Sequence, residues 1–295
     1  MPSTTSSPLV ITVAQLQALQ QSAPGNVMVF DCTFDLAQPQ AGEALYQQGH
    51  LPGAVYANLD TDLSAPHDAS GVAMDAASGG RHPLPSRERF ATWLSQIGFR
   101  NDMQAVVYDR NGVNYAGRLW WMLKWAGHDA VAVLDGGLQA WVAAGGTLEN
   151  TIPPRHFQSN FTLQPPLRAL RTADEVQQAL GTAQTLIDAR APARYRGEVE
   201  PLDPEAGHIP GALNRPFTSN MTADGHFKPS AQLRAEFDAL LAGRDPHAVV
   251  HQCGSGVSAL PNLIAMEIAG YAPSMLFAGS WSEWCRDASR PVERG

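Results

Sequence analysis

The 295-residue sequence predicts an α/β fold that occurs twice in tandem, each copy a mainly parallel sheet with helices on both faces. Three observations predict it. One pattern of residues occurs twice, short apolar runs alternate with helical ones, and a cysteine-containing loop joins a strand to a helix. Because such sheets bind ligands at the carboxyl ends of their strands, we expect the chemistry at a strand end.

The repeated pattern begins with an apolar strand that ends in an acid, followed by a Gly-His-x-Pro-Gly turn. In the two halves these features are Val27–Asp31 with Gly49–Gly53, and Thr185–Asp188 with Gly207–Gly211. A second apolar strand follows in each half, beginning at Ala105 and at Ala248 and thus separated by 143 residues. The sequence therefore contains two copies of one domain.

Hydrophobic periodicity places the elements within the first copy. It predicts helices over Val10–Leu19, Arg87–Ile97, Leu119–Ala126 and Leu138–Ala144, and strands near Val27, Ala105 and Val131. Residues 60–85 are rich in Ser, Ala, Gly and Asp, which predicts a loop whose enlarged part, 62–81, is specific to this copy. A proline-punctuated linker over 151–166 then separates an N-terminal domain, 1–150, from a C-terminal domain, 167–295.

The net charge and the cysteine count indicate which kinds of binding partner to expect. A net charge of -8 and a pI near 5.5 argue against nucleic acid and anionic membranes, and favour small molecules and proteins. Three scattered cysteines fit neither a disulfide framework nor a zinc site, so no metal is expected. With no basic leader in Met1–Pro8 and no apolar run of about 18 residues, we expect a cytoplasmic protein.

Cys253 lies between a strand and a helix. Ala248–His251 predicts a buried strand, and the periodic apolar residues of Leu260–Ile268 predict a helix with Pro261 in its first turn. Backbone N–H groups at such a point favour an anion, and a helix N-terminus lowers the thiol pKa from about 8.5. Cys253 is therefore a candidate thiolate nucleophile. The alternative is a buried, inert cysteine, which the glycines and serines just after it disfavour.

The loop Cys253-Gly-Ser-Gly-Val-Ser-Ala259 resembles the active-site loop of the rhodanese superfamily. Its uncharged start resembles the 3-mercaptopyruvate sulfurtransferase branch, whereas the thiosulfate sulfurtransferase branch usually carries basic residues after the cysteine. The resemblance covers nearly the whole chain. It implies two tandem rhodanese-like domains, a sulfurtransferase, and neither a metal nor an organic cofactor.

Two further positions, Arg110 and Ala259, bear on this interpretation. Arg110 occupies the position in the first copy that corresponds to Cys253, so we expect the N-terminal domain to be catalytically silent. A cysteine-dependent phosphatase needs an arginine six positions after the cysteine, where this sequence has Ala259. A phosphatase or arsenate reductase is therefore disfavoured.

The donor needs a cradle for its sulfur and a cation for its anionic end. We expect the cradle from the loop residues Gly254, Gly256, Val257 and Ser258. Arg194 matches the family's substrate-binding arginine through its Arg-Tyr-x-Gly pattern. For its neighbours Arg190 and Arg196 we expect a structural role instead, either as a solvated surface arginine or as a partner of Asp188.

One position departs from the mercaptopyruvate branch. That branch usually has a second substrate arginine nine residues after the first, where this sequence has Asp203, as the thiosulfate branch does. The loop argues the other way, because a dianion such as thiosulfate would gain from basic loop residues that are absent. We give the loop more weight because it touches the sulfur.

The resemblance also implies a proton relay of serine, histidine and acid. The matching residues are Ser255, His82 and Asp60, with His67 as the competing histidine. We expect the histidines of the two Gly-His-x-Pro-Gly turns to be structural. Neither Cys32 nor Cys285 has a glycine-rich loop, so both are expected to be non-catalytic.

These features predict an enzyme in which Cys253 takes sulfane sulfur from 3-mercaptopyruvate, releases pyruvate, and passes the persulfide on. The acceptor would be a thiol such as thioredoxin or glutathione, or cyanide. Thiosulfate is the alternative donor. A persulfide carrier or partner-binding module with low turnover is the alternative class, and partner binding that survives Cys253→Ser unweakened would favour it.

Overall fold

The computed structural model describes residues 8–152 and 157–295, which form two compact units, each with the predicted α/β fold. The first unit comprises the described residues up to Leu63, Ser86–Leu167 and Ala223–His226. The second comprises Ser64–Pro85, Arg168–Thr222 and Phe227–Gly295. Part of the expected linker, 153–156, and most of Met1–Pro8 lie outside the described residues. The boundaries 1–150, 151–166 and 167–295 stay a prediction.

The first unit is built on a five-stranded parallel sheet with the order β1-β5-β4-β2-β3. Its strands are β1 (Val10–Ile11), β2 (Val27–Asp31), β3 (Val55–Tyr56), β4 (Gln104–Tyr108) and β5 (Val131–Leu134). Its helices are α1 (Val13–Ser22), α2 (Ala41–Gln48), α3 (Arg87–Gln96), α4 (Ala116–Trp125) and α5 (Gly137–Ala143).

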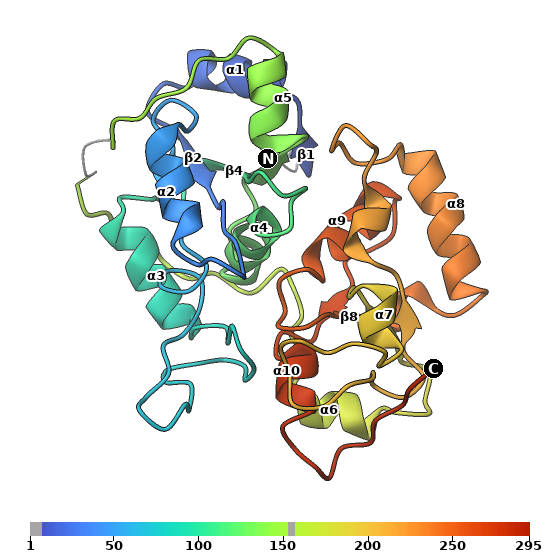
Figure 1. The fold of residues 1–295 in the computed structure, drawn as a ribbon. Coiled ribbons are helices and arrows are strands. Elements are labelled where there is room, and N and C mark those ends of the chain that lie inside the picture. Colours follow the sequence, from blue (N-terminus) through green and yellow to red (C-terminus); the bar gives the residue numbers. More distant parts are fainter. Residues whose placement is uncertain (1–7, 153–156) are drawn as a thin grey trace. The chain divides into compact units, whose positions relative to one another are not determined.

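Helices α1 and α5 lie side by side on one face of this sheet (Figure 1). Leu16 of α1 and Trp141 of α5 share an apolar core with strand residues such as Val106. Helix α4 packs against β4 and β5, and all ten of its residues are buried. The predicted layer architecture is therefore present, with helices covering the strands.

The helix predicted over Val10–Leu19 begins later than expected. Val10 and Ile11 form β1 and pair with β5, and α1 starts at Val13. Thr12 is its N-cap, because its side chain accepts from the N–H of Gln15 while the Gln15 side chain accepts from the N–H of Thr12. This reciprocal cap fixes the start of the helix. The two β-branched residues before Thr12 therefore form the edge strand of the sheet.

The second unit has a four-stranded parallel sheet with the order β7-β6-β8-β9. Its strands are β6 (Thr185–Asp188), β7 (Leu213–Asn214), β8 (Val249–Gln252) and β9 (Met275–Leu276). Its helices are α6 (Ala173–Gln178), α7 (Pro192–Tyr195), α8 (Ser230–Leu241), α9 (Leu260–Ile268) and α10 (Ser280–Trp284), with 3-10 turns η1 (Phe217–Asn220) and η2 (Pro246–Ala248). No helix in the described ranges is both long and apolar enough to cross a membrane.

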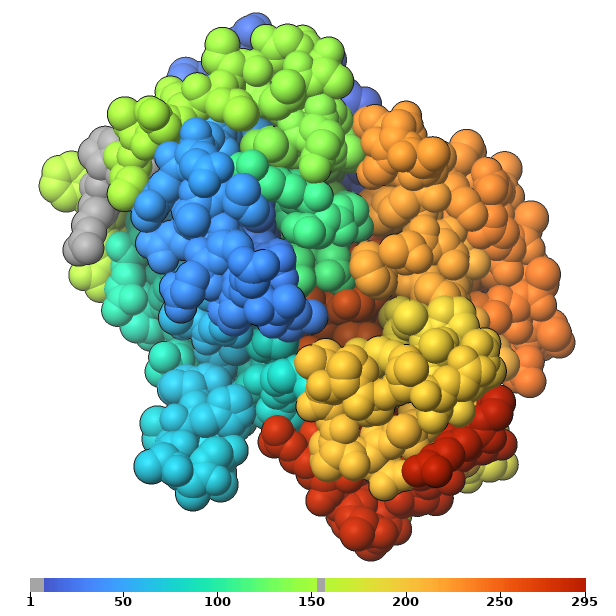
Figure 2. All heavy atoms as spheres, viewed as in Figure 1, coloured from blue at the N-terminus to red at the C-terminus, as the bar shows by residue number. Residues whose placement is uncertain are grey.

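The C-terminal end of the chain packs on the loop that follows α7. Arg294 donates to the backbone carbonyl of Ala206, and the N–H of Gly295 donates to Arg196. Figure 2 shows this red C-terminal segment lying against the yellow residues near 200. These contacts help to fix a loop that carries residues of the candidate site described below.

The repeat extends to individual backbone conformations. Val113 and Gly256, which are 143 residues apart, both have a left-handed φ, 65° and 71°. The turn histidines also match, because the Nδ1 atoms of His50 and His208 each lie 2.8 Å from a carbonyl oxygen. Each imidazole stacks on a tyrosine ring, with centroids 3.9 Å and 3.8 Å apart. The predicted structural role of both histidines is thereby confirmed.

Candidate active site

Cys253 directly follows β8, a central strand of the second sheet, and is only 2% exposed. Its N–H donates to Oγ of Ser280 at 3.1 Å, and its carbonyl accepts from the N–H of Trp281 at 3.0 Å. Helix α9 begins at Leu260 with Pro261 in its first turn, as predicted. The thiol is thus fixed between a strand end and a helix start, at the edge of the sheet where ligands bind.

The loop after Cys253 presents open backbone donors. Gly256 has φ +71°, and a Cβ there would lie 2.1 Å from the carbonyl oxygen of Ala278, so a larger residue is excluded. The N–H groups of Gly254, Val257 and Ser258 have no acceptor among the described residues. Converging unpaired N–H groups of this kind bind anions. The open N–H groups fit the predicted cradle, whose role in binding the donor stays a prediction.

The matching loop of the first unit is closed by its own side chain. Oδ1 of Asp109 accepts from the N–H groups of Asn111 and Val113 at 2.8 Å and 3.0 Å. Its Oδ2 accepts from those of Tyr115 and Ala116 at 2.8 Å and 2.9 Å. An internal carboxylate therefore occupies the place that an anionic ligand would take.

Arg110, at the position of the missing nucleophile, points its guanidinium away to other backbone groups. It donates to the carbonyl oxygen of Leu45 at 2.9 Å and also to that of Gly49. This loop has no thiol, and the Asp109 carboxylate already accepts from its N–H groups. Both facts fit the prediction that the N-terminal domain is not catalytic.

Two of the three predicted relay residues meet in the second unit. Nδ1 of His82 lies 2.8 Å from Oγ of Ser255, and both side chains are buried. The preceding residue, Arg81, donates its N–H to Oγ of Ser282 at 2.9 Å, which anchors the histidine's segment to α10. Asp60 belongs to the first unit, and its part in the relay stays a prediction. The competing residue, His67, forms a local backbone bridge with Ala73.

His251 is a second imidazole close to Cys253 in the sequence. It lies on β8 and is fully buried, and neither ring nitrogen has a partner within the described ranges. Burial, helped by the positive charge of Arg215, lowers the pKa of His251 to about 3. The imidazole of His251 is therefore neutral at physiological pH, and the role of His82 as proton carrier stays a prediction.

The three arginines that follow β6 have different surroundings. Arg190 is buried and forms a bidentate pair with Asp188, with closest atoms 2.7 Å apart, which confirms its predicted structural role. Arg196 is exposed and pairs with Glu198. Arg194 lies at the edge of the catalytic loop, with Nη1 3.5 Å from the point where a Cβ on Gly254 would lie. Of the three, only Arg194 is placed to meet a donor at the cradle.

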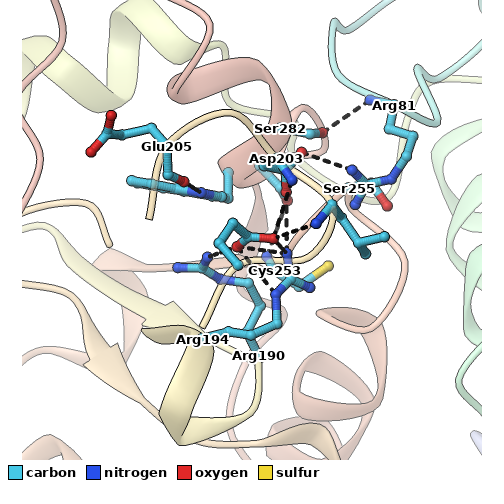
Figure 3. Close-up of polar contacts among 12 residues, drawn as sticks. Arg81, Arg190, Arg194, Asp203, Glu205, Cys253, Ser255 and Ser282 are labelled. Carbon is cyan, nitrogen blue, oxygen red and sulfur yellow. Dashed lines mark hydrogen bonds and ion pairs between the residues drawn. The ribbon is translucent and has the colours of Figure 1, made fainter. Parts of the chain in front are cut away.

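The structure also brings Arg81 and Asp203 to the site, which sequence reasoning did not pair. Nη1 of Arg81 lies 2.7 Å from Oδ1 of Asp203, and Nη2 of Arg194 lies 3.2 Å from Oδ2. Figure 3 shows this group beside Cys253. The signal available in the sequence was the basic residue directly before His82 in the enlarged loop, but a separation of 122 positions hid its contact with Asp203.

The other two cysteines are poor nucleophiles. Burial, with Asp109 and Asp31 nearby, raises the pKa of the Cys32 thiol well above its usual value. Burial and the charge of Asp203 raise the pKa of Cys285 to about 11. Both thiols stay protonated near neutral pH, and the thiolate is the reactive form. This agrees with their predicted non-catalytic status.

The fold and the loop both match a known protein family. A family model, the rhodanese-like domain, matches residues 12–144 and again 172–287. The chain belongs to the rhodanese family. The two matches confirm the predicted family and the tandem arrangement of two rhodanese-like domains.

Similar proteins match this rhodanese-like chain over almost its whole length. It is 46% identical over 295 residues to a probable 3-mercaptopyruvate sulfurtransferase of Pseudomonas aeruginosa, covering 98% of this chain and 99% of the relative. It is 41% identical over 294 residues to a putative thiosulfate sulfurtransferase, SseB, of Mycobacterium tuberculosis, covering 97% of each. Both names confirm the enzyme class, sulfurtransferase, and they divide between the two donors.

A solved structure supports the same rhodanese fold. The 3-mercaptopyruvate sulfurtransferase from Leishmania major superposes with a TM-score of 0.79 at 27% identity, covering 99% of this chain and 78% of that chain.

Proposed function

We propose that this protein transfers sulfur from 3-mercaptopyruvate to a thiol such as thioredoxin or glutathione, or to cyanide, through a persulfide on Cys253. The observation that carries the proposal is the uncharged loop 254–258, in which the N–H groups of Gly254, Val257 and Ser258 are open, next to the Ser255–His82 hydrogen bond of 2.8 Å. Further support comes from the relative at 46% identity that is named for this donor.

The proposed reaction has two steps. The Cys253 thiolate attacks the donor's sulfur, an S–S bond forms, and the C–S bond breaks. The electron pair of that bond goes to carbon, and the resulting enolate takes a proton to become pyruvate. An acceptor thiolate or cyanide then attacks the outer sulfur and releases the Cys253 thiolate. Loop N–H groups stabilise the negative charge on the persulfide, as an oxyanion hole stabilises oxygen.

The proposed proton carrier is the relay of Ser255, His82 and Asp60. The enolate needs a proton at carbon, and an imidazole can deliver one near neutral pH. Thiosulfate needs no such proton, because sulfite leaves as an anion. A relay therefore has a use with 3-mercaptopyruvate that it lacks with the other donor.

The donor is tested by comparing kcat/KM for 3-mercaptopyruvate and thiosulfate, with cyanide as acceptor. We expect 3-mercaptopyruvate to be preferred by about tenfold or more, which corresponds to about 1.4 kcal/mol of transition-state free energy. A preference for thiosulfate would show that Asp203, typical of the other branch, is the better guide. If neither donor turned over, a persulfide carrier module would become the leading interpretation.

The relay is tested with His82→Gln. We expect kcat with 3-mercaptopyruvate to fall about 100-fold, the lower range for lost acid–base catalysis, while thiosulfate turnover changes about threefold or less. His67→Gln is the matched control in the same loop and should leave both donors unaffected. Equal losses with both donors would mean that His82 supports the loop rather than moving protons.

A further inference from the structure

The charged residues beside Cys253 form a continuous alternating chain. In order they are Asp188, Arg190, Glu200, Arg194, Asp203 and Arg81, and consecutive members approach within 2.7, 3.5, 2.6, 3.2 and 2.7 Å. The inner members are fixed and buried, and Asp203 has a side chain only 3% exposed. Among the six, only the guanidiniums of Arg194 and Arg81 reach solvent, at 18% and 25%. The part of the chain that faces solvent is therefore a pair of arginines.

Both of these arginines are directed at the catalytic loop. Nη2 of Arg81 lies 3.3 Å, and Nη1 of Arg194 3.5 Å, from the point where a Cβ on Gly254 would lie. Neither nitrogen has an acceptor in the described part of the chain, whereas the opposite nitrogens of both side chains bind Asp203. Two unpaired cationic donors thus converge on the residue that follows the nucleophile.

The position of Arg81 is set by its backbone. Its N–H donates to Ser282 of α10, and the glycine before it packs closely, since a Cβ on Gly80 would lie 2.5 Å from the carbonyl oxygen of Gly279. The same helix donates to the Cys253 loop, because the N–H groups of Trp281 and Ser282 donate to the carbonyl oxygens of Cys253 and Gly254. Arg81 and the nucleophile are therefore held by one helix.

We propose that Arg81 is a second donor-binding residue, which holds the carboxylate of a 2-oxo acid donor together with Arg194 above Gly254. Asp203 is then a positioning residue that holds both guanidiniums. This inference rests on the proposed function. Planar guanidiniums bind carboxylates with paired hydrogen bonds, and two that converge on one point fix the orientation of the donor.

The arrangement also bears on the choice of donor. The charges of the three arginines and three carboxylates sum to zero, so the site has no excess positive charge for a dianion. A singly charged oxo acid gains the two guanidinium contacts, whereas thiosulfate would place a further negative charge close to Asp203. At position 203, where the mercaptopyruvate branch usually has a second substrate arginine, this chain has an acid. Arg81, in the loop before His82, therefore supplies the second cation of the site.

The first test is steady-state kinetics of the full chain. For Arg81→Met we expect KM for 3-mercaptopyruvate to rise about tenfold or more with kcat changed about threefold or less, because a uniform binding contact is lost. Arg81→Lys should recover part of the affinity. Arg196→Met, in the segment of Arg194 but paired with Glu198 on the surface, is the matched control and should match the wild type.

The second test measures binding without turnover. Pyruvate, the product that keeps the carboxylate, is titrated by calorimetry into Cys253→Ser and into the same variant with Arg81→Met. We expect about tenfold weaker binding with Arg81→Met and no change with Arg196→Met. If KM and pyruvate affinity stayed constant and only the melting temperature fell, Arg81 would merely anchor its loop and the inference would be overturned. A wild type inactive with 3-mercaptopyruvate would instead contradict the proposed function itself.

Discussion

Cys253→Ser is expected to abolish sulfur transfer from both donors, with kcat falling by at least about 1000-fold, because a serine hydroxyl is not ionised at neutral pH and is a poor sulfur nucleophile. The change replaces the side-chain sulfur by oxygen and leaves the backbone contacts of residue 253 to Ser280 and Trp281 in place. Folding should therefore be preserved, which circular dichroism and the melting temperature can verify.

The matched control is Cys285→Ser. That thiol has a pKa raised to about 11 and is protonated under assay conditions, so its loss should leave kcat within about threefold of the wild type. Mass spectrometry after incubation with donor should find one added sulfur atom on the peptide that contains Cys253. An added sulfur on Cys285 that cyanide removes at the rate of turnover would contradict the assignment.

Gln252→Asp is expected to inactivate the enzyme, because it introduces the carboxylate that Asp109 provides in the matching loop of the first unit. Gln252 lies at the position of Asp109, and its side-chain amide is buried without a partner among the described residues. The two loops have the same left-handed residue at matched positions, Val113 and Gly256. A carboxylate introduced at position 252 can therefore accept from the loop N–H groups, as Asp109 does in its own loop.

Two effects reduce the rate in that variant. The carboxylate occupies the donors that would stabilise the persulfide, and its negative charge repels the neighbouring Cys253 thiolate. Together they should lower kcat/KM by about 100- to 1000-fold, the range for a lost anion-stabilising donor. Alkylation of Cys253 by iodoacetamide, measured by mass spectrometry on the peptide that contains it, should be slower in this variant than in the wild type.

Gln252→Asn is the control for this prediction. It has the shape of aspartate without the charge, so kcat/KM should stay within about tenfold of the wild type. Equal activity of the aspartate and asparagine variants would show that residue 252 does not reach the loop N–H groups. The open cradle of the second unit would then need another explanation.

The sequence alone determined the family and the repeat, and it identified Cys253 as the candidate nucleophile. These are local properties: Cys253 and its glycines are contiguous, the turn histidines recur in the same pattern, and β8 and α9 follow from hydrophobic period. The helix start predicted at Val10 was wrong, because Val10 and Ile11 pair with β5, which no local pattern encodes. The helix predicted from Leu119 also begins earlier, at Ala116.

Only the tertiary structure decided which charges and protons surround the thiol. It brought His82 to within 2.8 Å of Ser255, although 173 residues separate them, and it paired Arg81 with Asp203. It also showed that Asp109 fills the first loop while the equivalent Gln252 leaves the second open. Such contacts depend on how loops from distant parts of the chain pack together. A residue's identity shows what it can bind, and the fold decides what lies within its reach.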